Sequence, residues 1–328
     1  MNGIKVSVIH GDAFHFKADT LVLKYAQASY GLDRDIIHQF ESMGYQIESK
    51  LPKIWGFFYS ESRKITNTQN IIFIGVPPLR QFGYKEIREF GRKSLSSLAS
   101  SDPKSKSIII TIHGPGYGLD EVEAFESQIA GINDSIASED YPDQLEEIIF
   151  IERSKGRSKR LQDVLVNLFP NGFIPTQKSG GQKNIGHNSA ETLRAAGYCS
   201  DSKKRVFVAM PFASDFDDCF HYGIQGAVNA SGYLCERADL QSFTGDVMEW
   251  VKNRIATAHF LIADLTTANP NVYLEVGYAW GLNKKTVLLI KDTKELKFDT
   301  RGQRCLLYKS IKDLETKLKF ELDNLRIQ

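Results

Sequence analysis

The chain has 328 residues, of which 42% are hydrophobic and 25% are charged, a composition typical of a soluble globular protein with two domains. Its 41 basic and 40 acidic side chains give a net charge of +1, so the basic surface that duplex nucleic acid requires is not expected. The chain lacks both a signal-peptide pattern and an apolar run of roughly 18 residues, so we expect a cytoplasmic protein with no membrane partner.

The first half of the chain alternates strand-like and helix-like segments. Apolar runs such as NIIFIGV (70–76) and SIIITI (107–112) are typical of buried strands, and residues 84–99 carry apolar side chains at helical spacing. In chain order we expect strands at 4–9, 20–23, 70–76, 107–112 and 146–152, and helices at 84–99, 120–136 and 157–168. This alternation predicts an α/β sheet with helices on both faces.

A change in composition separates the two halves. Residues 176–204, TQKSGGQKNIGHNSAETLRAAGYCSDSKK, are rich in Gly, Ser, Asn and Lys and contain few large apolar side chains. We interpret this segment as a linker with a short helix at 190–196. The two expected domains are then residues 1–175 and 205–328.

The second half repeats the alternation. We expect strands at 205–210, 233–237, 260–265 and 286–290, and helices at 215–231, 246–258 and 270–283. This order predicts a flavodoxin-like, doubly wound parallel sheet, in which ligands bind outside the carboxyl ends of the strands. The four cysteines and seven histidines show none of the spacings of a zinc site or a helical metal site, so we expect reduced thiols, no metal and no resident cofactor.

One glutamate, Glu275, stands among apolar neighbours in the helix expected at 270–283. Asn269 can cap this helix, and Pro270 fits its first turn, where no N–H is required. Glu275 lies at helical spacing among three residues of the apolar face, namely Val272, Val276 and Ala279. A half-buried carboxylate is costly unless it is paired or used, so two interpretations remain open: a buried ion pair, or a catalytic group beside the ligand crevice.

Residues 205–308 resemble the nucleoside 2-deoxyribosyltransferase-like and TIR-like superfamily. The resemblance rests on five segments in order, namely VFVAMPF (206–212), ERADL (236–240), GDVMEWVKNRIATAHFLIADLT (245–266), NPNVYLEVGYAWGLNKKTVLLI (269–290) and KFDTRGQRCLLY (297–308). In the deoxyribosyltransferases the glutamate of an ELG motif attacks the anomeric carbon of the sugar, and it corresponds here to Glu275. Cleavage of an N-glycosidic bond develops positive charge on the ribose, which a nearby carboxylate stabilises or traps.

The sequence departs from this family at one position. The deoxyribosyltransferases carry an acidic residue six positions before the glutamate, where this chain has Asn269, and Asp264 is the nearest carboxylate that could replace it. The departure favours hydrolysis or a binding-only role over base exchange. The expected substrate-binding residues follow strand ends or begin the helix, and they are Met210, Pro211, Phe212, Arg237, Asp239 and Asn271. For Arg237 and Asp239 a surface ion pair is an equally simple explanation.

A glycine-rich turn in the first half is a candidate phosphate site. The segment HGPGYG follows an expected strand and precedes an expected helix, where backbone N–H groups can approach an anion; a plain tight turn is the alternative. The segment IHGDAFHFKADTLVLKYAQASYGLD (9–33) resembles the opening of macro-like domains, including the N-terminal domain of leucine aminopeptidases. LVLKYAQ replaces the asparagine-rich segment of ADP-ribose-binding macrodomains, so the resemblance implies nucleotide binding without de-ADP-ribosylation. The candidate nucleotide-binding residues are Gly11, Asp12, His113, Gly114, Gly116, Tyr117 and Gly118.

Three functions therefore remain open. The first is N-glycosidic cleavage in NAD, a nucleotide or a nucleoside, controlled by a small nucleotide ligand of the first domain; the resemblance implies a homo-oligomeric effector of bacterial antiviral defence. The second is a non-catalytic module that binds nucleotides and assembles. The third is deoxyribosyl transfer in nucleoside salvage.

Overall fold

The computed structural model describes residues 3–114, 118–176, 185–238, 247–296 and 302–327. The chain forms two compact units. The first unit comprises Met1–Pro115 and Glu121–Ser200, and the second comprises Gly116–Asp120 and Asp201–Gln328. Each unit contains its own largely parallel sheet with helices, which confirms the predicted α/β fold with two domains.

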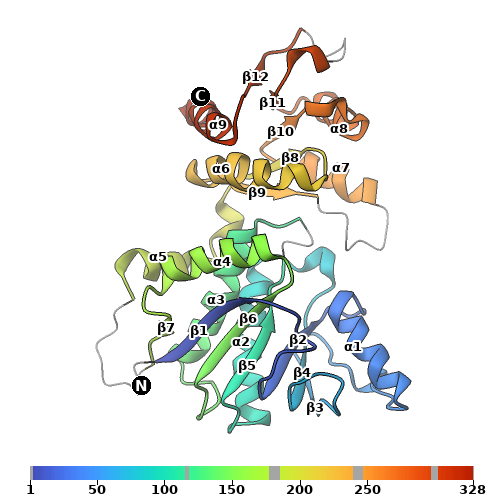
Figure 1. Ribbon diagram of the computed structural model, residues 1–328, viewed down its shortest axis with the longest axis vertical. Coiled ribbons are helices and arrows are strands. Elements are labelled where there is room, and N and C mark those ends of the chain that lie inside the picture. The colour runs from blue at the N-terminus through green and yellow to red at the C-terminus, as the bar shows by residue number, and fades with distance from the viewer. Residues whose placement is uncertain (1–2, 115–117, 177–184, 239–246, 297–301, 328) are drawn as a thin grey trace. The chain divides into compact units, whose positions relative to one another are not determined.

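The sheet of the first unit has seven strands in the order β3-β4-β2-β5-β6-β1-β7 (Figure 1). The five central strands are parallel, and β3 and β7 pair antiparallel at the two edges. The strands are β1 (Ile4–His10), β2 (Thr20–Tyr25), β3 (Phe57–Glu61), β4 (Asn70–Gly75), β5 (Ser107–Thr111), β6 (Glu147–Glu152) and β7 (Phe173–Ile174). The central strands are nearly continuous apolar runs because helices bury both faces of a parallel sheet.

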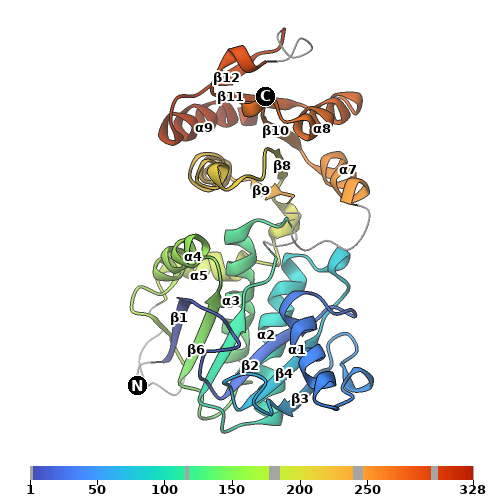
Figure 2. The ribbon, with the colours of Figure 1, turned by 45° about the vertical axis from the view of Figure 1, so that its right-hand side comes forward.

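Five α-helices accompany this sheet: α1 (Gly31–Ser42), α2 (Tyr84–Ser101), α3 (Glu121–Ala137), α4 (Lys155–Leu168) and α5 (His187–Ala195). Helices α2 and α3 run side by side (Figure 2). Gly91 and Gly131 permit this close approach, because a Cβ at either position would collide with the backbone of the other helix. The packing of these helices therefore depends on glycine at both positions.

The sheet of the second unit has five parallel strands in the order β12-β11-β10-β8-β9. Numbered within the unit, this order is 2-1-3-4-5, which is the flavodoxin-like arrangement that the sequence predicts. The strands are β8 (Arg205–Ala209), β9 (Leu234–Arg237), β10 (Phe260–Asp264), β11 (Thr286–Ile290) and β12 (Cys305–Leu307). The α-helices are α6 (Gly226–Ala230), α7 (Val247–Thr257), α8 (Pro270–Gly281) and α9 (Ile311–Ile327).

The two faces of this sheet carry separate apolar clusters. Helices α7 and α8 cover one face, where residues such as Val251, Val276 and Leu261 are buried together. Helices α6 and α9 cover the other face, with Leu318 packed near Ile262 of β10. Because side chains alternate along a strand, Asp264 at the end of β10 falls on the α9 face.

Several elements differ from the sequence-based expectation. The helix expected at 215–231 is divided into a 3-10 turn (Ser214–Phe216), a π-helical segment (Cys219–Gln225) and α6. The sequence analysis missed β3, α1, β7, β12 and α9; β3, β7 and β12 lie at sheet edges, where burial is only partial and the apolar signal is weak. The short helix expected at 190–196 is present as α5, which begins at His187.

The segment interpreted as a linker is partly anchored. Arg88 of α2 donates hydrogen bonds to the carbonyls of Leu193 and Ala196 at the end of α5, and its guanidinium pairs in a bidentate manner with Asp134 of α3. The hydroxyl of Ser200 donates to Glu123 at 2.5 Å. Residues 187–200 therefore pack as part of the first unit instead of joining two domains as a free linker.

Candidate functional site

The order of the strands in the second unit reverses between β8 and β10. In such sheets the crevice outside the carboxyl ends at this point is the usual place for a ligand. Met210, Pro211 and Phe212 follow β8, and a short turn after β10 leads into α8. The sequence-predicted residues of the second unit that the structure describes thus gather around the carboxyl edge of one sheet.

Helix α8 begins as predicted. The side chain of Asn269 accepts a hydrogen bond of 2.9 Å from the backbone N–H of Asn271, and Pro270 is the first helical residue. The preceding turn is strained, because Thr267 and Ala268 adopt φ values of 66° and 49° in the left-handed region. The capping bond and this turn fix the direction in which α8 leaves the carboxyl edge.

Glu275 is half-buried on α8, next to the apolar face of the helix that packs on the sheet. Val272, Val276 and Ala279 are fully buried, as the spacing predicts. One turn beyond Glu275, the ring of Tyr278 lies 5.8 Å from the ammonium of Lys252 on α7. Since residues three apart share one side of a helix, Glu275 lies on the side of α8 that neighbours α7.

The electrostatic surroundings of Glu275 are apolar. Burial raises the pKa of its carboxyl group to about 7. The N-terminus of α8 does not bring this pKa back to the usual value of a glutamate. No hydrogen bond or ion pair joins Glu275 to any residue within the described part of the chain. The ion-pair interpretation therefore has no partner there, and a group poised near neutral pH is typical of functional carboxylates.

Asp264 has a different environment. It is fully buried, and its two oxygens accept hydrogen bonds from the Thr266 N–H at 3.0 Å and from the Tyr308 hydroxyl at 2.6 Å. Burial raises the pKa of Asp264, and these hydrogen bonds offset part of that effect. Because Asp264 lies on the α9 face and Glu275 on the α8 face, the structure places these two candidate catalytic carboxylates on opposite faces of the sheet.

Arg237, at the end of β9, brings three predicted substrate-binding residues together. Its guanidinium lies 4.0 Å from the sulfur of Met210 and 5.9 Å from the ring centroid of Phe212. It also stacks on Phe220 at 4.2 Å and pairs with Asp217 at 3.2 Å. The side chain of Arg237 is nearly buried, whereas that of Asp217 is half exposed. A ligand at the carboxyl edge could therefore replace Asp217 as the partner of the guanidinium.

The other predicted residues of this site have simpler positions. Pro211 is buried, and Asn271 is exposed at the start of α8. Asp239 lies outside the described residues. The cysteines are free thiols, with Cys219 and Cys235 buried.

In the first unit, the candidate residues lie at the carboxyl ends of β1 and β5, which flank β6. Asp12 accepts a hydrogen bond from the Phe14 N–H and pairs with Arg153 at 3.1 Å. Burial alone would raise the pKa of Asp12, but these two contacts lower it. Gly11 continues the pairing with β6, and Gly114 has a φ of 112° that favours glycine.

The glycine-rich turn does not stay within the first unit. Gly118 belongs to the second unit, where a Cβ would meet the ring of Trp250 and the carbonyl of Arg237. Gly116 and Tyr117 lie outside the described residues. Gly118 therefore has a packing reason to be glycine that is independent of any phosphate.

His113 is buried beside an ion pair that the sequence analysis did not identify. The imidazole lies 4.9 Å from the Phe90 ring, and burial together with the charge of Lys24 holds its pKa well below the usual range. Lys24 pairs with Asp33 at 2.9 Å, and both side chains are buried. A lysine inside the apolar strand TLVLKY was the available signal, because such a residue requires a buried partner.

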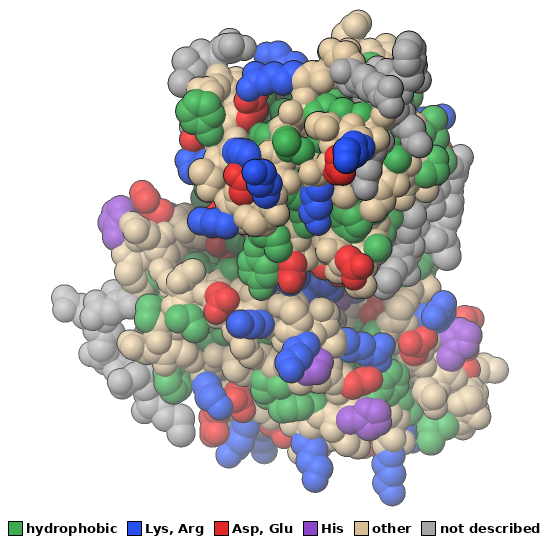
Figure 3. All heavy atoms as spheres, turned by 45° about the horizontal axis from the view of Figure 1, so that its top comes forward, with side chains coloured by type: hydrophobic (Ala, Val, Ile, Leu, Met, Phe, Trp, Pro, Cys, Tyr) green, Lys and Arg blue, Asp and Glu red, His purple; other side chains and the backbone are tan. Residues whose placement is uncertain are grey.

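Neither a metal site nor a membrane segment is found in the part of the chain that the structure describes. Its His, Cys, Asp and Glu side chains do not gather in groups of three that could hold an ion. None of its helices has both the length and the apolar character needed to cross a bilayer. On the face shown in Figure 3, basic, acidic and apolar side chains are interspersed.

No family model matches the chain, and no curated protein matches it. Among solved structures, it is similar to an Oceanobacillus iheyensis macrodomain with MES bound, at 16% identity and a TM-score of 0.42, with 52% of this chain and 94% of that chain covered. A Trypanosoma brucei macrodomain in complex with ADP is 14% identical at a TM-score of 0.39, with 49% and 68% covered. These similarities are distant and cover about half of the chain, and they assign no function to it.

Proposed function

We propose that the second unit cleaves an N-glycosidic bond in NAD, a nucleotide or a nucleoside, with Glu275 as the carboxylate that acts on the ribose. The observation that carries this proposal is the environment of Glu275: a half-buried carboxyl group on the helix that follows the carboxyl end of β10, with a pKa of about 7 and no hydrogen-bond or ion-pair partner within the described chain. The sequence resemblance described above supports the same residue.

The chemistry requires a negative charge next to the anomeric carbon. As the C1′–N bond breaks, its electron pair leaves with the base and positive charge develops on the ribose ring. The ionised Glu275 stabilises that charge or forms a bond to C1′, and water then supplies the hydroxyl group of the free sugar. The apolar surroundings strengthen this electrostatic interaction relative to water.

The choice of leaving group follows from the residues near the start of α8. Asn269 uses its side chain to cap the helix, and Asp264 is buried on the other face with both oxygens occupied. Neither is placed to donate a proton to a departing base. The arrangement therefore favours a base that leaves without protonation, such as the cationic pyridinium of NAD, over an ordinary purine or pyrimidine.

Arg237 packs with Met210 and Phe220 on the sheet face that α6 and α9 cover. We assign it to the anionic part of a substrate that crosses the carboxyl edge of the sheet to reach Glu275 on the other face. The guanidinium of Arg237 is held by Phe220 and Met210 at the carboxyl edge, and its acidic partner Asp217 is half exposed. A phosphate can replace that carboxylate because a guanidinium binds both in the same bidentate manner.

A second candidate function concerns the first unit. His113 and Gly114 follow β5, and Asp12 follows β1, two strands away, or about 10 Å across a parallel sheet. This edge can hold a nucleotide, which would make the first unit a sensor for the second, in an oligomeric defence effector of the kind that the sequence resemblance implies. Binding without catalysis, or transfer between nucleosides, are the alternative outcomes.

The test is chromatographic analysis of the full-length protein incubated with NAD, ATP and a panel of nucleosides, with and without ADP-ribose. We expect nicotinamide release by the unmodified chain and none by Glu275→Gln. Glu249→Gln, an exposed glutamate on the neighbouring helix α7, is the matched control and should retain activity. If the unmodified chain released no base from any substrate, the enzymatic proposal would be contradicted. If it exchanged bases between nucleosides, the reaction would be transfer and not hydrolysis.

A further inference from the structure

Helix α9 exposes a large aromatic side chain. Phe320 is 68% exposed, the highest value among the exposed large hydrophobic residues of the described chain. Leu318 and Leu322, which lie on the opposite side of the helix, are fully buried against the sheet. Phe320 therefore lies at the surface of the second unit and is not part of its apolar cluster.

The residues before Phe320 in α9 are basic, and those after it are acidic. Lys317 and Lys319 precede it, and Glu321 and Asp323 follow it. Within one chain these groups pair locally: Lys319 with Asp323 at 2.8 Å, and Lys317 with Asp313 at 2.9 Å. Local pairs of this kind at a surface are weak and exchange readily.

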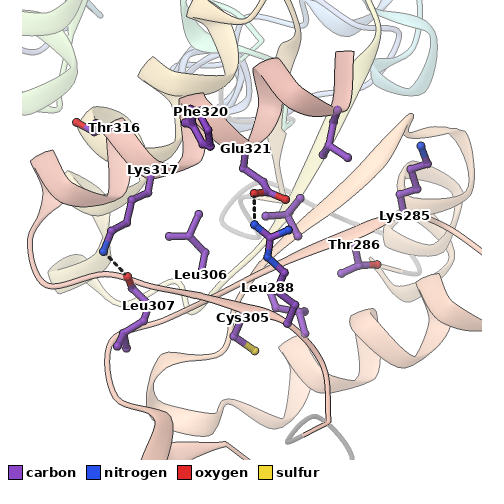
Figure 4. Close-up of a pocket in the computed structure, with 13 residues that line it drawn as sticks. Lys285, Thr286, Leu288, Cys305, Leu306, Leu307, Thr316, Lys317, Phe320 and Glu321 are labelled. Carbon is purple, nitrogen blue, oxygen red and sulfur yellow. Dashed lines mark hydrogen bonds and ion pairs between the residues drawn. The ribbon is translucent and has the colours of Figure 1, made fainter. Parts of the chain in front are cut away.

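A groove of about 720 Å³ lies beside Phe320, between α9, the edge strand β12 and its neighbour β11 (Figure 4). Its apolar lining includes Val287, Leu306 and Leu325, which are only partly buried. Arg304 pairs with Glu321 at 2.7 Å, and both residues line the groove. An exposed aromatic ring and an apolar groove are thus neighbours on one surface, and a two-fold axis brings the same patch of both copies together.

We propose that this surface binds a second copy of the same chain, with the two α9 helices antiparallel about a two-fold axis at Phe320. In this arrangement the two Phe320 rings meet at the axis, next to both grooves. On the groove side of the helix, Lys317 of one copy faces Glu321 of the other, and on the far side Lys319 faces Asp323. The symmetry repeats each pair, so four attractive contacts form and no like charges oppose each other at these positions.

The size of the contact sets its strength. Helix α9 has 17 residues, so it is about 25 Å long. One helix with its groove provides less than the roughly 800 Å² per partner of a standard stable interface. We therefore expect a reversible dimer that dissociates on dilution and weakens as added salt screens the charge pairs.

Sedimentation velocity of the full-length protein over a wide concentration range tests this interface. The unmodified chain should shift from monomer to dimer as its concentration rises. Phe320→Ser should move that transition to at least tenfold higher concentration, without lowering the melting temperature. Val166→Ser, which removes an apolar side chain of 58% exposure from α4, is the matched control and should leave the transition unchanged.

Charge reversal gives a sharper test of the antiparallel pairing. A chain with Lys317→Glu and Lys319→Glu, and another with Glu321→Lys and Asp323→Lys, should each remain monomeric alone and form a heterodimer when mixed. A chain with all four substitutions should dimerise again. The proposal is overturned if the unmodified chain stays monomeric throughout, if the reversed chains associate as the unmodified chain does, or if native mass spectrometry finds a small amphiphile in place of a second copy.

Discussion

Tyr308 donates a hydrogen bond of 2.6 Å to Asp264, although the two residues lie 44 positions apart in the sequence. The bond joins the residue that follows the edge strand β12 to the last residue of the central strand β10. Both side chains are fully buried, and Asp264 also receives the N–H of Thr266 in the turn that leads to α8. This contact therefore helps to hold the turn from which the helix of Glu275 begins.

Tyr308→Phe should destabilise the second unit. The substitution removes one of two donors from a buried carboxylate, which costs about 1–3 kcal/mol of unfolding free energy. Urea unfolding of the full chain measures this, with Tyr222→Phe, a tyrosine of 47% exposure in the same unit, as the control. A loss no larger than that of the control would show that the hydrogen bond contributes little to the stability of the turn.

Glu275→Gln should stabilise the protein at high pH. The pKa of Glu275 is about 7 in the folded protein but near 4.3 in an unfolded chain, so the unfolded chain loses this proton first. Stability contributed by the protonated form is full below about pH 4.3 and is lost as the pH rises to 7. The amide variant cannot ionise, and we expect it to be more stable than the unmodified chain by about 1–3 kcal/mol at pH 8 and equal at pH 4.

Unfolding free energies of both proteins at the two pH values check this expectation. Equal behaviour of Glu275→Gln at the two pH values would mean that the carboxylate of Glu275 is well solvated when ionised. In that case the inference that Glu275 is buried would be wrong, as well as the proposed role of Glu275 in catalysis.

The buried pair of Lys24 and Asp33 should show strong coupling. Asp33→Leu leaves an ammonium group buried without its acidic partner and should cost about 3–5 kcal/mol. Lys24→Met combined with Asp33→Leu removes both charges and should recover most of that loss. Chemical denaturation of Lys24→Met, Asp33→Leu and the double variant gives the coupling energy between the two residues. If the two single losses of unfolding free energy simply added up in the double variant, the residues would not be coupled.

Arg88→Met should release α5 from the first unit. The arginine carries hydrogen bonds to the carbonyls of Leu193, Arg194 and Ala196, and its loss leaves these groups without their donor. Hydrogen exchange of residues 187–200 should accelerate at least tenfold, while the central strands keep their protection. Arg92→Met, which removes only a half-exposed pair with Glu89, is the control and should leave this segment unchanged.

Periodicity predicted most of the strands and helices of both units, although it missed the helices α1 and α9. The runs NIIFIGV and FLIADL are strands in the structure because consecutive apolar side chains are buried only in a sheet covered on both faces. The start of α8 was equally predictable, since a capping asparagine followed by proline acts through local backbone chemistry. The half-buried position of Glu275 followed from helical spacing alone.

Contacts between residues far apart in the chain could not be predicted from the sequence. Nothing near Asp264 indicates that Tyr308 will satisfy it, or that alternation along β10 will place it on the face opposite Glu275. The same holds for Arg88, which anchors a segment more than 100 positions away whose composition indicated a linker.

The sequence by itself determined the α/β class, the order of most strands and helices, and a carboxylate placed on the inner side of one helix, because these depend on the local period of apolar residues. Only the tertiary structure decided that Glu275 lacks a partner within the described residues, that Asp264 has two, and that Met210 and Phe212 meet at Arg237. The physical reason is that desolvation and hydrogen bonding depend on which distant segments fold against each residue, and no local pattern specifies that.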